Sequence, residues 1–149
     1  MGNIHCLNPV LWKKESRLSY SKEACQSLLL KSQGKFRSAE LSFREGLYDS
    51  AVSDLYYSAF QTISALMVLR GVSIHKHTYV RSYINKELGL KGIVSLDLVK
   101  MYNILMTSRE DADYKPNVFH DKEFVSDLLN KVKRWNNEIR KLIDADLQQ

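Results

Sequence analysis

One short segment carries the side chains in this sequence that are best suited to chemistry. Residues 108–114 read Ser-Arg-Glu-Asp-Ala-Asp-Tyr, and His120 follows six residues after Tyr114. If these groups meet in one cleft, they could bind a phosphodiester, or cleave it with His120 as a base and Arg109 stabilising the charge on phosphorus. Arg109 and Asp113 also have the i,i+4 spacing of an ordinary ion pair at a helix end. The elements around the segment must decide between these interpretations.

Those elements read as helices from about residue 27 onward, because apolar residues recur every three to four positions and no alternating strand pattern persists. Leu98, Tyr102, Leu105 and Arg109 fall on one stripe of a helix that starts near Ser95, so Arg109 should face the core near its open end. We expect four further helices, at roughly residues 27–46, from the Asp49 and Ser50 caps to Gly71, from Thr78 to Leu88, and from the Asp121 cap onward.

The predicted fold is therefore an all-α antiparallel bundle of about five helices with short connections. The charge-free stretch between Asp54 and Arg70 is apolar over most of a helix surface, which indicates burial in the bundle centre or at a subunit interface. A length of 149 residues fits one domain. We place a basic arm or short helix at residues 1–24 and the helical domain at residues 25–149.

Charge and cysteine content limit the function classes. Residues 1–39 hold seven basic and two acidic side chains, so their 7 − 2 = +5 equals the net charge of the chain. A basic segment favours polyanions, although a solvated surface gives the same pattern. Cys6 and Cys25 show neither a disulfide framework nor zinc spacing. His75 and His77 flank Lys76 without a carboxylate or cysteine nearby, so we predict no metal site and no cofactor.

The chain shows no signal-peptide pattern in its first residues, because charged side chains interrupt them. Its longest charge-free apolar run, residues 55–69, is shorter than the ~20 apolar residues that a membrane span needs. We therefore expect a cytoplasmic protein with no membrane segment.

Several motifs in order along residues 31–143 resemble the HEPN domain family, in particular its small single-domain prokaryotic members. They are Gly-Leu-Tyr-Asp-Ser-Ala at 46–51, Asp-Leu-Tyr-Tyr-Ser-Ala-Phe at 54–60, His77, and Arg-Glu-x-Ala-Asp-Tyr at 109–114. The resemblance implies a helical bundle with a four-helix up-and-down core that forms a homodimer, with the ends of the fourth helices lining one cleft. It also implies a partner, a minimal nucleotidyltransferase, in modules of the toxin-antitoxin kind.

In ribonuclease members of this family, an Arg and a His separated by four to six residues cleave RNA without metal. Here ten residues separate Arg109 from His120, and Pro116 offers a turn that would bring His120 back. The resemblance implies RNA or nucleotide binding at Arg109, Asp113, Tyr114 and His77, with Arg109 and His120 as the catalytic candidates. We rank binding first, a metal-independent ribonuclease second and a protein-binding helical module third.

Overall fold

The structure, a computed structural model, describes residues 9–74 and 76–149, with backbone alone for residues 9–15. The described residues contain helices and no strand, which confirms the all-α prediction. The elements are α1 (Pro9–Arg44), α2 (Tyr48–Leu69), α3 (His77–Tyr83), the π-helical turn η2 (Ile84–Gly89), α4 (Leu96–Tyr114) and α5 (Lys122–Leu147).

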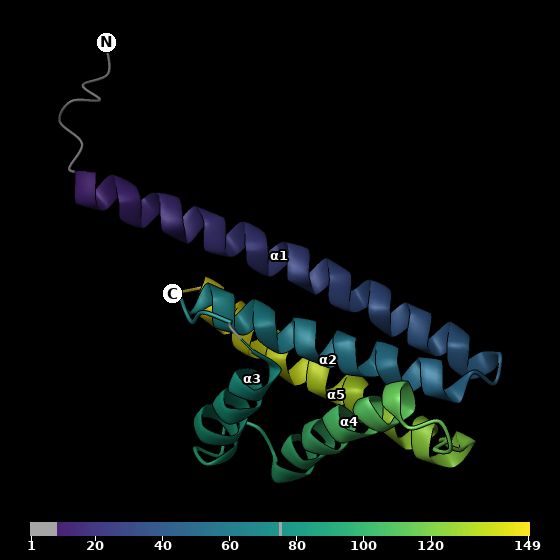
Figure 1. Cartoon of the computed structure of the whole chain (residues 1–149). Coiled ribbons are helices and arrows are strands. Elements are labelled where there is room, and N and C mark those ends of the chain that lie inside the picture. Colours follow the sequence, from purple (N-terminus) through teal and green to yellow (C-terminus); the bar gives the residue numbers. More distant parts are fainter. Residues whose placement is uncertain (1–8, 75) are drawn as a thin grey trace.

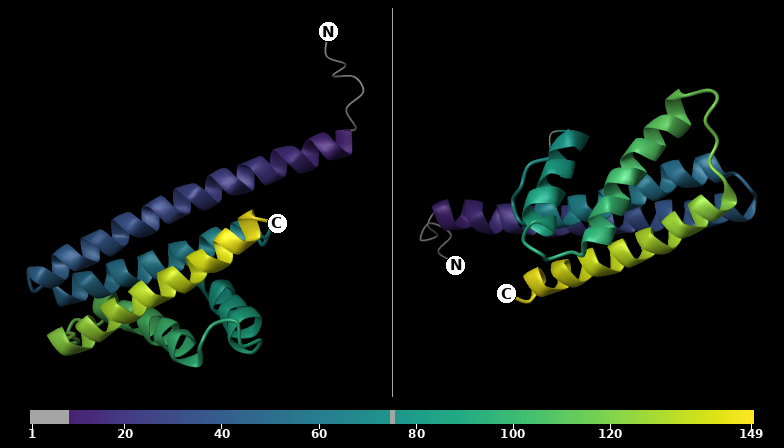
Figure 2. Two further views of the ribbon diagram at one scale, coloured as in Figure 1. Left: turned by 180° about the vertical axis from the view of Figure 1, so that it is seen from behind. Right: turned by 90° about the horizontal axis from the view of Figure 1, so that it is seen from below.

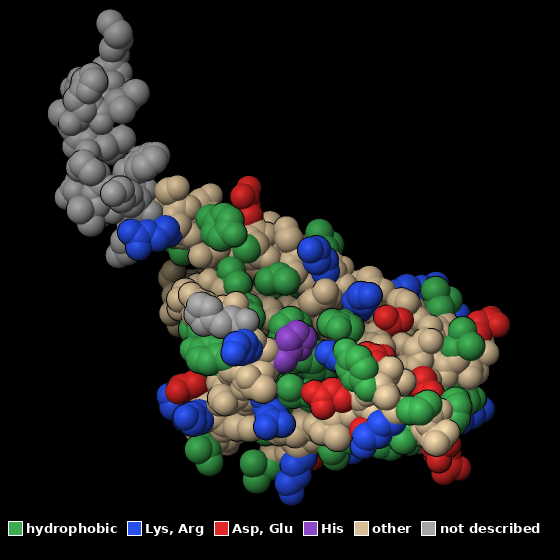
Figure 3. Space-filling model, in the orientation of Figure 1, with side chains coloured by type: hydrophobic (Ala, Val, Ile, Leu, Met, Phe, Trp, Pro, Cys, Tyr) green, Lys and Arg blue, Asp and Glu red, His purple; other side chains and the backbone are tan. Residues whose placement is uncertain are grey.

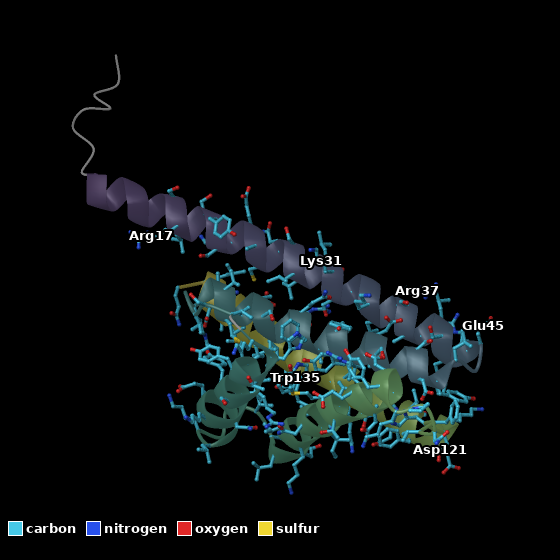
Figure 4. The ribbon with its side chains drawn as sticks, in the orientation of Figure 1. Arg17, Lys31, Arg37, Glu45, Asp121 and Trp135 are labelled. Carbon is cyan, nitrogen blue, oxygen red and sulfur yellow. The ribbon has the colours of Figure 1, made fainter. Side chains whose placement is uncertain are left out.

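Helices α1, α2 and α5 run along one another, and α4 crosses them at a steep angle on the side opposite α1 (Figures 1 and 2). The most extensive packing joins α1 to α2, and α2 also packs against α5 and α4. As the sequence predicts, α2 is central: twelve of its residues are buried. Trp135 of α5 lies between the helices in the middle of the molecule (Figure 4), fully buried, and its indole Nε1 donates to the Ala59 carbonyl at 3.2 Å.

The first helix is much longer than predicted, because it begins at Pro9 rather than near residue 27. Proline is favourable at the first position of a helix, and no glycine or second proline interrupts residues 10–33. The periodicity missed this part because Leu18 and Tyr20 are exposed there and form no buried stripe. The helix does not break at residue 24, and the division of the chain at that point stays a prediction.

The other helix ends follow the expected signals with two differences. Gly46 and Gly71 end α1 and α2 with φ values of 74° and 72°, a region that glycine enters without strain. Asp121 caps α5 by accepting from the Phe124 N–H at 2.8 Å. The predicted helix from Thr78 to Leu88 is instead α3 followed by η2, and Asp49 lies inside the first turn of α2 rather than capping it.

A buried polar cluster ties α1 to α2 and α5. Ser32 of α1 donates to the Ser58 carbonyl at 2.8 Å, Ser58 donates to the Ser32 carbonyl at 2.9 Å, and Asn136 of α5 donates to the Ser58 hydroxyl at 3.0 Å. Because buried hydroxyl and amide groups need partners, this reciprocal set fixes the register of the three helices. No helix in the described ranges is both long and apolar enough to cross a lipid bilayer.

Candidate functional site

An open groove lies between the start of α3 and the last turns of α4. Its volume is about 680 Å³, and its walls include Lys76, His77, Arg109, Glu110 and Tyr114. We call this feature the Arg109 groove. On the face shown in Figure 3, a histidine side chain is visible with basic and acidic side chains close to it. The groove therefore contains three of the four residues for which the sequence predicts ligand binding.

Arg109 projects from α4 onto two tyrosine rings of α2. Its guanidinium carbon lies 5.1 Å from the Tyr56 ring centroid and 5.5 Å from that of Tyr57, which is the geometry of a cation–π interaction. The side chain is only 14% exposed. Its Nε is buried and has no hydrogen-bond partner in the described part of the chain. The aromatic rings thus hold a charged guanidinium at the groove wall while leaving donor capacity unused.

Asp113 is the acidic neighbour of Arg109, one turn along α4. Its Oδ2 lies 3.5 Å from the Arg109 guanidinium, while its Oδ1 accepts from the Ser53 hydroxyl of α2 at 2.8 Å. The predicted i,i+4 pair therefore exists, but it is long, and the shorter bond ties Asp113 to α2. Asp113 does not belong to the groove wall as we define it. Asp113 therefore ties the end of α4 to α2 and also forms a long ion pair with Arg109.

Tyr114, the last residue of α4, is 75% exposed in the same groove. An exposed phenol ring of this kind can stack on a nucleobase or donate to a phosphate oxygen. Unlike the fully buried Tyr56, it is open to a ligand without a change in the core.

His77, the first residue of α3, is packed between the core and the groove. Its ring stacks on Phe60 with centroids 4.4 Å apart and an angle of 7° between the planes, and its Nδ1 is hydrogen-bonded to the Tyr56 hydroxyl. Burial and the nearby Arg109 charge lower the pKa of His77 below its usual range. The imidazole is therefore neutral at pH 7.

Tyr56 contacts both Arg109 of α4 and His77 of α3. Its ring makes a cation–π contact with the Arg109 guanidinium, and its hydroxyl is hydrogen-bonded to His77 Nδ1. It is fully buried, and burial raises its pKa to about 12. Tyr102 of α4 lies beneath it with ring centroids 6.1 Å apart, and burial also raises the pKa of Tyr102. The core next to Arg109 and His77 thus contains two buried, neutral phenols.

His120 lies at a different place, before α5. Its Nδ1 is 2.8 Å and its backbone N–H 3.0 Å from Asp49 Oδ1, and its ring stacks on Phe124 with centroids 5.3 Å apart. It lines a separate hollow with Gly46–Ser50 and Phe119. Within one chain, the structure does not place Arg109 and His120 in the same pocket, and their catalytic pairing stays a prediction.

The described residues contain no group of three or more His, Cys, Asp and Glu side chains that could hold a metal ion. His75 and Cys6, considered above as metal or disulfide candidates, lie outside the described residues. Cys25 of α1 is a buried free thiol.

A family model for the HEPN domain matches residues 25–142. The chain belongs to the HEPN domain family. A protein of Thermotoga maritima named UPF0332 is 34% identical over 106 residues, which cover 71% of this chain and 80% of the relative. A protein of Methanocaldococcus jannaschii that carries the name "Putative toxin" is 28% identical over 130 residues, covering 87% of this chain and 88% of the relative.

The sequence does not predict two sets of contacts at this HEPN site, those of Tyr56 and Tyr57 and that of Asp49. Tyr56 and Tyr57 belong to the charge-free stretch for which the sequence predicts burial, whereas their rings also contact the Arg109 guanidinium. Asp49 was expected to be a helix cap, whereas it binds His120. The spacing of Tyr56 and Tyr57 on α2 gives no hint of a partner on α4, since that contact depends on how the two helices cross.

Proposed function

We propose that this HEPN protein binds RNA or a nucleotide in the Arg109 groove. The observation that carries the proposal is the position of Arg109, whose guanidinium lies over two tyrosine rings and lines the groove together with the exposed Tyr114. A guanidinium in this position offers charged donors to phosphate oxygens, and Tyr114 offers a stacking surface to a base.

The proposal is tested by equilibrium binding of a fluorescein-labelled single-stranded RNA and of a labelled ATP to the full chain. We expect Arg109→Ala to weaken binding by about tenfold or more, because it removes charge-assisted hydrogen bonds. Arg109→Lys should recover only part of the loss, since lysine lacks the planar fork. Arg134→Ala is the matched control, because Arg134 pairs with Asp97 at 3.1 Å outside the groove. Equal effects of Arg109→Ala and Arg134→Ala would contradict the proposal.

The exposed basic residues of α1 add a second, sequence-independent contact. Arg17, Lys31 and Arg37 are spaced along this helix (Figure 4), and all three are exposed. If they contact RNA phosphates, log affinity falls linearly with log salt concentration, by roughly 0.7 units of slope per phosphate on a single strand. A slope near zero would remove α1 from the binding surface.

We further propose that the chain is one half of a HEPN and nucleotidyltransferase pair with a toxin-like role. The support is the family, together with the name of the M. jannaschii relative. Expression of the chain alone should arrest growth, and co-expression with a small nucleotidyltransferase encoded beside it should restore growth. Growth that is unaffected in both cases would contradict this role. Light scattering on the purified chain tests the homodimer.

The second candidate function is a metal-independent ribonuclease that uses Arg109 and His120. A specific observation favours it: Asp49 holds His120 Nδ1 at 2.8 Å, which is the way a carboxylate orients a catalytic imidazole. Because the two residues line different pockets of one chain, cleavage would need groups from two chains. Degradation of total RNA in the presence of a chelator, lost in both Arg109→Ala and His120→Ala, would establish this function. Activity that persists in both variants would indicate a contaminant.

A further inference from the structure

The two ring nitrogens of His77 face different surroundings. Nδ1 is hydrogen-bonded to the Tyr56 hydroxyl, which belongs to a fully buried side chain. The hydrogen bond of His77 within the described ranges is made through Nδ1 and leaves Nε2 available, and the residue lines the Arg109 groove. A ligand in the groove therefore meets Nε2, while the core holds Nδ1.

The Tyr56 proton decides which nitrogen is protonated. A buried phenol must donate its proton to an acceptor, and His77 Nδ1 is the partner of the Tyr56 hydroxyl. The neighbouring buried phenol is Tyr102, whose hydroxyl has no partner besides Tyr56 among the described residues. If Nδ1 carried the proton and donated to the Tyr56 oxygen, the Tyr56 proton would have to go to the Tyr102 oxygen, and the Tyr102 proton would then have no acceptor. The arrangement that satisfies Tyr56 has Nδ1 as acceptor and Nε2 as the N–H of a neutral imidazole.

The groups around His77 also oppose a second proton. Protonation at Nδ1 would make the Tyr56 hydroxyl of α2 the acceptor of this hydrogen bond and would leave its own proton without the acceptor it has in the neutral state. From α4, the positive charge of Arg109 disfavours an imidazolium and Glu110 favours one. Lys76, the adjoining residue, also lines the groove. The stacking of the ring on Phe60 further separates it from water.

We propose that Tyr56 fixes His77 as a neutral Nε2–H donor, so that the Arg109 groove holds a phosphate ester through one guanidinium and one uncharged imidazole. The inference rests on the function proposed above and specifies how the same site recognises its ligand. His77 touches the ligand, and Tyr56 is a positioning residue. In this state His77 has no free lone pair for a ribose hydroxyl proton, so it binds RNA and does not act as the base.

The imidazole is tested first without any ligand. Two-bond nitrogen–proton correlation NMR on the uniformly ¹⁵N-labelled full chain, assigned with His77→Gln, distinguishes the two neutral forms and the imidazolium. We expect the Nε2–H form of His77 from pH 8 to pH 6, and a mixture of both neutral forms in Tyr56→Phe. An Nδ1–H form or an imidazolium in the wild type at pH 6.5 would overturn the inference, whether or not the chain binds RNA.

The ligand contact is tested next with His77→Ala and His77→Gln, using labelled RNA and labelled ATP in parallel. Because only a neutral donor is needed, His77→Gln should stay within about twofold of wild type, while His77→Ala should lose about fivefold, the worth of one hydrogen bond. The ratio of wild-type to His77→Ala affinity should be constant from pH 5.5 to 8.0. A ratio that grows as pH falls would indicate an imidazolium contact and contradict the inference.

The two ligands separate the remaining outcomes. Effects confined to RNA identify a phosphodiester ligand, and effects confined to ATP identify a free nucleotide; either result supports the inference. If neither probe binds, the proposed function fails, and the ligand contact of His77 fails with it. If RNA or ATP binds but His77→Ala and His77→Gln behave alike, the proposed function stands and only the role of His77 is wrong.

Discussion

Two polar regions of this molecule each contain a histidine. The hydrogen bonds of His120 are made within the fold, whereas the Arg109 groove, which contains His77, is open to a ligand. His120 has Asp49 on its Nδ1 and its backbone N–H and Phe124 against its ring, so these two nitrogens are paired within the fold. At the Arg109 groove, the Arg109 Nε is unpartnered and Tyr114 is 75% exposed. We infer that the contact of Asp49 with His120 mainly serves stability and that the groove mainly serves binding.

The largest expected effect concerns the Asp49 contact with His120. Asp49→Ala removes two hydrogen bonds to a carboxylate and leaves the His120 N–H without its partner, which should lower the free energy of unfolding by about 3 kcal/mol. Urea denaturation measures the loss. RNA affinity under native conditions should change by less than about twofold, since Asp49 does not line the groove.

Asp121→Ala is the control for this comparison. Asp121 follows His120 in the sequence and caps α5, but it takes no part in the hydrogen bonds between Asp49 and His120. It should cost about 1 kcal/mol, the usual worth of a helix cap. An Asp49→Ala variant that is as stable as wild type but has lost RNA binding would contradict the assignment of stability to the Asp49–His120 contact and of binding to the Arg109 groove.

Alkaline pH should act on Tyr56, the buried phenol in contact with Arg109 and His77. The pKa of Tyr56 is raised to about 12 from an ordinary value of 10, so between these values the unfolded chain loses a proton that the folded chain keeps. The stability associated with the neutral phenol is complete below pH 10 and is lost as pH rises through about 12. The free energy of unfolding should fall by about 2 kcal/mol across this window.

Unfolding by urea at pH 9 and pH 11.5 measures the loss, with Tyr56→Phe expected to reduce it and the exposed Tyr20→Phe expected to leave it unchanged. An identical pH dependence in wild type and Tyr56→Phe would show that the buried phenol beneath Arg109 does not set the alkaline limit.

Tyr114→Ala should give the opposite pattern to Asp49→Ala. Loss of an exposed stacking surface should weaken RNA binding by about 1.5 kcal/mol, roughly tenfold, and leave the free energy of unfolding unchanged. Tyr114→Phe keeps the ring and should keep most of the affinity. If both variants lose the same affinity, the hydroxyl rather than the ring makes the contact.

The fold was predictable from the sequence because its signals are local: Gly46, Gly71 and the Asp121 cap end or start helices where expected, and the α4 stripe correctly turns Arg109 toward the core. The site was predictable only in part. Whether His77 or His120 shares a pocket with Arg109 depends on the crossing of α4 over α2 and on the path of residues 115–121. These are long-range properties, and neither residue spacing nor periodicity encodes them.

The smallest expected effect tests how Asp113 is shared between the scaffold and the groove. Ser53 donates to Asp113 Oδ1 at 2.8 Å, while Oδ2 stays 3.5 Å from Arg109. Ser53→Ala should cost about 0.5 kcal/mol of stability, as expected for an exposed hydrogen bond. The freed carboxylate can then pair more closely with Arg109 and compete with phosphate, so RNA affinity should fall by about twofold. Fluorescence anisotropy measures this change against Ser82→Ala, an exposed serine of α3. Tighter RNA binding in Ser53→Ala would contradict this expectation. It would mean that the hydrogen bond from Ser53 holds Asp113 where its carboxylate opposes the ligand.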